Sequence, residues 1–167
     1  MKKLLFVTTT LLIFSCSDGD LEIETLDFDS VSIEQCGTAS LETEIFFKRN
    51  SSEVLILNLQ TGLLLNEVSA ETIVSTIPGQ SQLIYRIFDD NVSSNYFCDD
   101  FPPATPRVIE EIEAEDGQVL ITTTTLDNTT FTHTIQLQGI SLVNAQGERI
   151  TDLSINEFGE VTTTVSN

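Results

Sequence analysis

Basic residues are scarce in this sequence. Its 167 residues include 7 Lys and Arg against 26 Asp and Glu, which gives a formal net charge of −19. Binding to nucleic acid depends on neutralising phosphates with Lys and Arg, so this composition excludes nucleic acid as a partner. Charge-driven adhesion to an anionic membrane surface is disfavoured for the same reason. Such a charge keeps a protein soluble and repels like neighbours, and it says little about the fold.

The chain also lacks most of the residues that common hydrolytic mechanisms need. It has one histidine, His133, and no tryptophan. His133 shares a predicted strand face with Phe131 and Ile135, which indicates a hydrogen-bonded core residue and not an acid–base catalyst. Neither a Gly-x-Ser-x-Gly nor a His-Glu-x-x-His motif occurs. The acidic residues are spread over predicted strand edges and turns, and a sugar-cleaving site would lack aromatic platforms. We therefore expect that the protein is not an enzyme.

The first 15 residues contain the parts of a secretory signal peptide, and a cysteine follows them directly. Lys2 and Lys3 precede an apolar run from Leu4 to Phe14, which is shorter than the roughly 20 residues needed to cross a bilayer. Ile13-Phe14-Ser15-Cys16 resembles the lipobox of bacterial lipoproteins. The resemblance implies cleavage before Cys16, which would change the net charge from −19 to −21, and acylation of that cysteine by several chains that hold the protein on a membrane. The alternative is a secreted protein whose Cys16 is unmodified.

Acidic residues begin directly behind Cys16, in Ser17-Asp18-Gly19-Asp20-Leu21-Glu22. This segment resembles the signal that sends Bacteroidetes lipoproteins to the outer face of the outer membrane; the alternative is a solvated acidic tether. Asp29-Ser30-Val31 matches the short O-glycosylation motif of that phylum, so Ser30 is a candidate glycosylation site. We expect a signal peptide over 1–15, a lipidated acidic tether over 16–29 and a single β domain over 30–167.

Two cysteines remain after Cys16, namely Cys36 and Cys98. Outside the cytoplasm such a pair favours a disulfide over a metal site or a nucleophile. Zinc would need more ligands than these two cysteines and His133 can offer. A disulfide closing a loop of about 60 residues would stabilise the fold by roughly 4 kcal/mol in the chain-entropy model.

Alternation of polar and apolar residues with period two recurs along the chain, whereas helical periodicity is hard to find. Val54 to Leu59 is apolar at both parities, which indicates a strand covered on both sides or a short helix turned inward. Asp116-Gly117 lies between two alternating runs and predicts a hairpin turn. In the predicted strand 130–143 the apolar residues change parity, which a bulge at Gln138-Gly139 would explain. Eight or more short strands predict an antiparallel β-sandwich, Ig-like or jelly-roll-like, with a β-barrel as second choice.

One irregular stretch, from Asp89 to Pro106, contains three of the four prolines and several hard oxygen ligands. Proline makes it a loop or an extended connection. Calcium takes ligands of this kind, so the stretch is a candidate calcium site. The spacing matches no EF-hand loop, and solvated turn residues are the alternative. No other cofactor is expected. The candidate ligands are Asp89, Asp90, Asn91, Asp99 and Asp100.

Three segments together carry a family resemblance: the lipobox with its acidic follower, the stretch from Gln82 to Cys98, and Phe101–Glu111 with the following Asp-Gly. On these segments, about half of the mature chain, the sequence resembles a group of uncharacterised lipoproteins from flavobacteria and related Bacteroidetes. The resemblance carries no activity and no catalytic residues. It implies an outer-membrane lipoprotein, anchored by its lipid and facing the cell exterior.

The expected function is therefore a non-catalytic binding or envelope-structural role at the cell surface, with an envelope protein as a candidate partner. The alternative is a ligand-carrying or accessory subunit of an outer-membrane nutrient-uptake complex. A large apolar cavity or a calcium ion in the Asp89–Asp100 loop would favour the carrier, whereas a solid core with an exposed apolar patch would favour a role in protein interaction.

Overall fold

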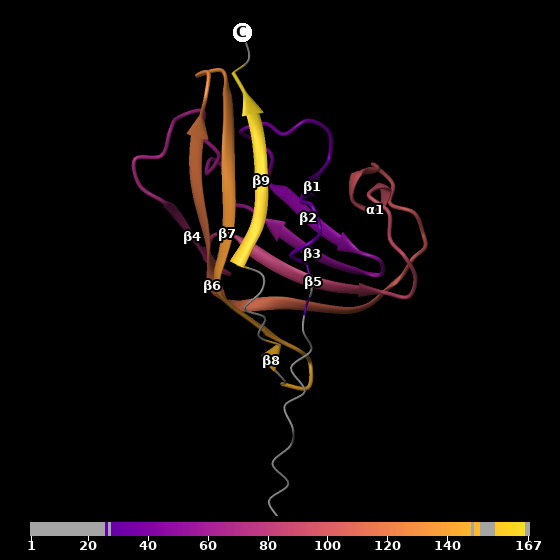
Figure 1. The fold of residues 1–167 in the computed structure, drawn as a ribbon. Helices are drawn as coiled ribbons and strands as arrows, with labels where there is room; N and C mark the ends of the chain where they lie inside the picture. The colour runs from indigo at the N-terminus through magenta and orange to yellow at the C-terminus, as the bar shows by residue number, and fades with distance from the viewer. Residues whose placement is uncertain (1–25, 27, 148, 151–155, 166–167) are drawn as a thin grey trace, which may run out of the picture.

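The computed structural model describes residue 26 and residues 28–147, 149–150 and 156–165. Its strands form one antiparallel sheet that curls into a half-barrel (Figure 1). The all-β, antiparallel class predicted from the alternation is confirmed. The described elements are β1 (Glu34–Gln35), β2 (Ile45–Asn50), β3 (Glu53–Asn58), β4 (Ile73–Ile77), β5 (Gln82–Phe88), α1 (Asn95–Cys98), β6 (Val108–Thr125), β7 (Thr130–Val143), β8 (Arg149–Ile150) and β9 (Glu157–Thr164).

The long strand β6 belongs to both halves of the curled sheet. Its first part pairs with β5, in the half with the order β1-β2-β3-β5-β6. Its second part pairs with β4 on one side and with β7 on the other, and β9 adds to the far side of β7. The fold thus has features of both predicted architectures. The two halves face one another across a core, as sandwich layers do, but β6 joins them into a continuous surface.

The predicted hairpin at Asp116-Gly117 is wrong, because β6 runs through these residues. Two register shifts against β7 lie on either side of Asp116. Gly117 has a φ of 140°, and a Cβ at this position would lie 2.6 Å from Cδ1 of Ile140. Backbone conformation and close packing therefore both require glycine here. The Asp-Gly pair bends the strand from one half of the sheet into the other and does not reverse the chain.

The predicted bulge in β7 is confirmed. Between the pairs Asp116–Ser141 and Gln118–Gln138, β7 has one residue more than β6. Gly139 has a φ of 64°, in the left-handed region where a bulge favours glycine. Because of this bulge, the apolar residues that follow it face the core although they have the other parity in the sequence. The core residues of this strand are Phe131, Ile135, Leu137, Ile140 and Leu142.

The main core lies between the two halves and extends to the first described residues. Leu26 and Phe28 are 1% and 0% exposed and belong to this core. The ring of Phe28 stands edge-on to that of Tyr85, with centroids 6.3 Å apart. These two residues therefore lie in the packed body and not in the tether that we expected over residues 16–29.

A second apolar cluster covers the outer face of β3 and β5. The predicted strand at Val54 to Leu59 is present as β3, which ends at Asn58, and its residues 54–57 are buried on both sides: Leu55 and Leu57 face the main core, while Val54 and Ile56 face the second cluster. The cover comes from residues 89–106 and includes α1, which lies to one side of the sheet in Figure 1.

Aromatic packing and a disulfide hold this cover in place. Phe97 of α1 stacks on Phe47 of β2 with ring centroids 4.6 Å apart. Cys98, at the end of α1, forms a disulfide with Cys36, 62 positions earlier in the chain. The predicted Cys36–Cys98 disulfide is thus present, and it ties the irregular stretch to the segment that follows β1.

Candidate functional site

Of the two modification sites predicted from the sequence, only Ser30 lies among the described residues. Cys16, the predicted lipidation site, lies outside the described residues. Ser30, the candidate glycosylation site, is exposed in a turn at the edge of a groove described below. No helix among the described residues is long and apolar enough to cross a membrane.

The candidate calcium ligands are all exposed and lie on both sides of α1. Asp89, Asp90 and Asn91 precede the helix, and Asp99 and Asp100 follow it. Protein groups already bond to some of them, since Asp89 Oδ1 accepts a hydrogen bond from the Arg107 backbone N–H at 2.8 Å and Asp99 Oδ2 accepts one from Asn95 at 3.3 Å. In the described part of the chain, no group of three or more His, Cys, Asp or Glu residues is placed to hold a metal. The calcium site stays a prediction.

His133 is fully buried, and both of its ring nitrogens are hydrogen-bonded. Nδ1 lies 2.8 Å from Thr123 Oγ1, and Nε2 lies 2.8 Å from Thr163 Oγ1. Thr163 Oγ1 donates its proton to Asn66 Oδ1 at 2.7 Å, so it must accept from Nε2–H. This bonding pattern selects the neutral Nε2–H tautomer, with Thr123 donating to Nδ1. Burial lowers the pKa of His133 below its usual value. The histidine is the hydrogen-bonded core residue that its strand parity predicted.

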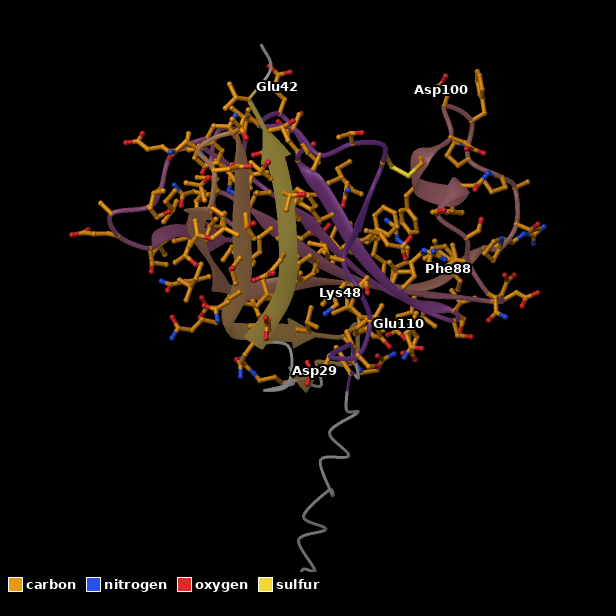
Figure 2. The ribbon with its side chains drawn as sticks, turned by 45° about the horizontal axis from the view of Figure 1, so that its top comes forward. Asp29, Glu42, Lys48, Phe88, Asp100 and Glu110 are labelled. Atoms are coloured by element: carbon orange, nitrogen blue, oxygen red, sulfur yellow. A yellow bond between two sulfur atoms is a disulfide. The ribbon has the colours of Figure 1, made fainter. Side chains whose placement is uncertain are left out.

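A groove of about 730 Å³ opens at the end of the half-barrel, between the first described residues and the start of β9. Residues 29–33 form one wall and residues 156–160 form the other, with Lys48 between them. Figure 2 shows Asp29 at this end of the molecule, close to the start of β9, with Lys48 above it. The side chains around the groove are mostly polar or charged.

Two local features of β9 shape this groove. Gly159 has a φ of 147°, and a Cβ there would lie 3.0 Å from Ile33 Cβ, so glycine allows the opposite wall to approach the strand. Phe158 is an extra residue in the pairing of β9 with β7, because Gly159 pairs with Ile135 and Glu157 with Gln136. This bulge turns the Phe158 ring into the core, where it is fully buried, and leaves the flanking carboxylates exposed.

Lys48 is the buried cation of this groove. It lies on the same face of β2 as the core residue Phe46 and is only 3% exposed. Its Nζ lies 3.5 Å from the Glu157 carbonyl oxygen and 5.8 Å from the centroid of the Phe158 ring. Burial lowers the pKa of Lys48, while the nearby charges of Asp29 and Glu157 oppose this shift.

The hydrogen-bonding capacity of Lys48 is only partly used. An ammonium group has three N–H donors, and with the described residues Nζ makes a single hydrogen bond, at the outer limit of hydrogen-bond length. The two ion pairs among the described residues, Arg49–Glu34 and Arg86–Glu111, do not include it. The groove therefore holds a buried positive charge with two donors that bond to none of the described residues, beside carboxylates that can pair with positive groups.

Sequence reasoning missed this groove, because alternation gives no signal for it. Lys48 shares its parity with Glu42 and Glu44 as well as with Phe46, so the sequence does not place it on the core side of the strand, where the structure has it. A buried charged residue is a recognised indicator of function once its burial is known. The two walls could not be joined from the sequence, because residues 29–33 and 156–160 are distant in the chain.

Comparisons with protein-family models, with curated proteins and with solved structures found no match to this chain. The structure defines it as an all-β, antiparallel protein with a curled sheet and a disulfide between Cys36 and Cys98.

Proposed function

We propose that this protein is a lipoprotein anchored through Cys16 to the outer membrane, facing the cell exterior, where it acts as a non-catalytic binding module. The groove around Lys48 is its binding site, and Ser30 at the rim is the residue that carries a glycan. The lipobox, the acidic residues behind Cys16 and the resemblance to Bacteroidetes lipoproteins support the location. The observation that carries the binding role is the buried ammonium group of Lys48 at an open groove.

The energetics of Lys48 support a role in binding. Removing an ammonium group from water costs several kcal/mol unless hydrogen bonds and opposite charges compensate. In this groove the charges of Asp29 and Glu157 act on the ammonium group, but the compensation from the described residues is incomplete, because Nζ makes one long hydrogen bond and no ion pair with them. A ligand with oxygen acceptors would complete it. Fold stability alone would favour an apolar residue at this core-facing position.

The shape of the groove favours a binding module over a carrier. A carrier of apolar cargo would need an enclosed apolar cavity. This groove opens to the surface and is lined by charged residues such as Asp29, Lys48 and Glu160. The burial of His133, with both nitrogens bonded to threonines, supports a non-catalytic role.

The location is tested by labelling cells with an alkyne-tagged fatty acid and comparing wild type with Cys16→Ser. We expect the label on the wild-type chain only, and we expect protease added to intact cells to degrade the protein. A labelled Cys16→Ser chain, or full protection from protease until the outer membrane is permeabilised, would contradict this part of the proposal.

The binding role is tested by a pull-down from intact cells after mild crosslinking. Lys48→Met is the test variant, and Arg107→Met is the control because Arg107 is an exposed cation in a distant loop. We expect the wild type and the control to recover one envelope partner that Lys48→Met loses. Equal recovery by all three chains would show that the groove is not the binding site.

A further inference from the structure

We propose that the groove binds an extended peptide segment of net positive charge. A main-chain carbonyl of the peptide accepts hydrogen bonds from Lys48, and its basic side chains pair with the carboxylates of Asp29, Glu157 and Glu160. The inference rests on the proposed function of the groove as a binding site and names the class of ligand.

The first step concerns the acceptor on the ligand. Lys48 is 3% exposed and lines the groove, and its one hydrogen bond with the described residues is the 3.5 Å contact with the Glu157 carbonyl. Its remaining donors require oxygen atoms that reach into the groove. A peptide main chain supplies such an oxygen at every residue.

The second step concerns charge. Asp29, Glu157 and Glu160 line the groove together with Lys48, so three acidic residues accompany one basic residue, and Glu160 Oε1 also accepts a hydrogen bond from Thr134 Oγ1 at 3.1 Å. The whole chain carries a formal net charge of −19. A simple anion would meet repulsion from the carboxylates and from the field of the protein, whereas a cationic segment is attracted by both. A neutral sugar would use neither charge, and the chain has no tryptophan on which a sugar ring could stack.

The third step concerns size and shape. The groove has a volume of about 730 Å³, within the range of roughly 300–1,000 Å³ for ligand sites. One of its walls, the start of β9, is an extended strand, while the other, residues 29–33, begins in a turn closed by the hydrogen bond from the Val31 N–H to the Phe28 carbonyl, and the groove is open to the surface. An extended segment fits along the β9 wall, with side chains reaching the carboxylates at the rim.

The test measures the fluorescence anisotropy of a short labelled peptide of alternating Lys and Ser during titration with the full chain, kept in a detergent without sugar headgroups. The variants are Lys48→Met and Lys48→Arg, with Arg107→Met as the control for loss of a distant positive charge. Asp29→Asn is compared with Glu42→Gln, because Asp29 and Glu42 lie at opposite ends of the molecule (Figure 2). Circular dichroism establishes that each variant is folded.

If Lys48 binds the peptide, Lys48→Met should lower the affinity for the peptide, whereas the change in net charge alone would raise it. Loss of any positive charge from an acidic protein should leave binding of a cationic peptide unchanged or slightly stronger, and we expect this of Arg107→Met. Lys48→Met should weaken binding about tenfold or more, because it removes hydrogen bonds to a charged donor. Lys48→Arg keeps a donor and should bind more tightly than Lys48→Met. Asp29→Asn should weaken binding about twofold to fivefold and Glu42→Gln should not.

The proposal is overturned if Lys48→Met and Arg107→Met bind the peptide equally well, or if a peptide of alternating Glu and Ser binds as tightly as the basic one. Binding of a neutral disaccharide or a free amino acid, lost in Lys48→Met and without peptide binding, would also overturn it while leaving the groove as a binding site. If the binding of no probe depends on Lys48, and recovery of the partner in the crosslinked pull-down does not depend on Lys48, then both the peptide proposal and the proposed function are wrong.

Discussion

Thr163→Val removes the central hydroxyl of a buried polar chain and nearly preserves the volume of the side chain. In the native protein this hydroxyl accepts from His133 Nε2–H and donates to Asn66 Oδ1, at 2.8 and 2.7 Å. The substitution leaves the donor of His133 without a partner in a site where the histidine is 0% exposed. Asn66 is only half-buried, so water can replace its lost partner.

A buried donor left without a partner costs about 1–3 kcal/mol. We therefore expect Thr163→Val to lower the free energy of unfolding by that amount, measured by urea denaturation with circular dichroism as the signal. Thr163→Ser is the matched control, because it keeps the hydroxyl and loses one methyl group, worth about 0.8 kcal/mol. A Thr163→Val chain as stable as the wild type would refute the reasoning. So would a ¹⁵N NMR spectrum of the wild type with the proton on Nδ1 of His133.

Three further predictions concern the stability of the fold. Burial lowers the pKa of His133 in the folded state, so on acidification the unfolded chain takes up the proton first. The free energy of unfolding should therefore fall as the pH drops below about 6.5, the ordinary pKa of histidine. Urea midpoints measured between about pH 7 and about pH 5.5 test this, and a His133→Asn variant should lack the dependence. Phe28→Ala should lower the free energy of unfolding by about 3–5 kcal/mol, because Phe28 is 0% exposed, whereas Phe101→Ala, at a residue 90% exposed, should change it little; equal effects in urea denaturation would contradict the placement of Phe28 in the core. Replacement of Cys36 and Cys98 by Ala should cost about 4 kcal/mol, because the bond closes a loop of 62 positions; a loss below about 1 kcal/mol would show that aromatic packing alone holds the cover.

Local patterns predicted the parts of the fold that depend on neighbouring residues. Alternation along the chain predicted the antiparallel, all-β class that the strands have. The bulge at Gly139 followed from a change of parity within one strand, and the burial of His133 followed from its parity with Phe131 and Ile135. In each case the physical cause, alternation of side chains across a pleated sheet, acts over a few residues.

The same reasoning failed where distant segments decide the outcome. Asp116-Gly117 has the composition of a hairpin turn, but Ile140 of β7 packs against Gly117 and β4 pairs alongside, so the strand continues. The groove depends on residues 29–33 lying against the start of β9, and no local pattern encodes that contact. Lys48 shares its parity with Glu42 and Glu44 as well as with Phe46, so alternation alone does not show that it faces the core.

Site-specific photocrosslinking in intact cells tests the central claim, that the protein binds through the groove beside Lys48, most directly. A photoreactive amino acid is placed at Ser32 on the groove wall, and as a control at Thr124, an exposed residue near the end of β6 that does not line the groove. The account predicts a crosslinked product from Ser32, none from Thr124, and loss of the Ser32 product when Lys48→Met is added. No product from Ser32, equal products from both positions, or a Ser32 product unaffected by Lys48→Met would contradict it.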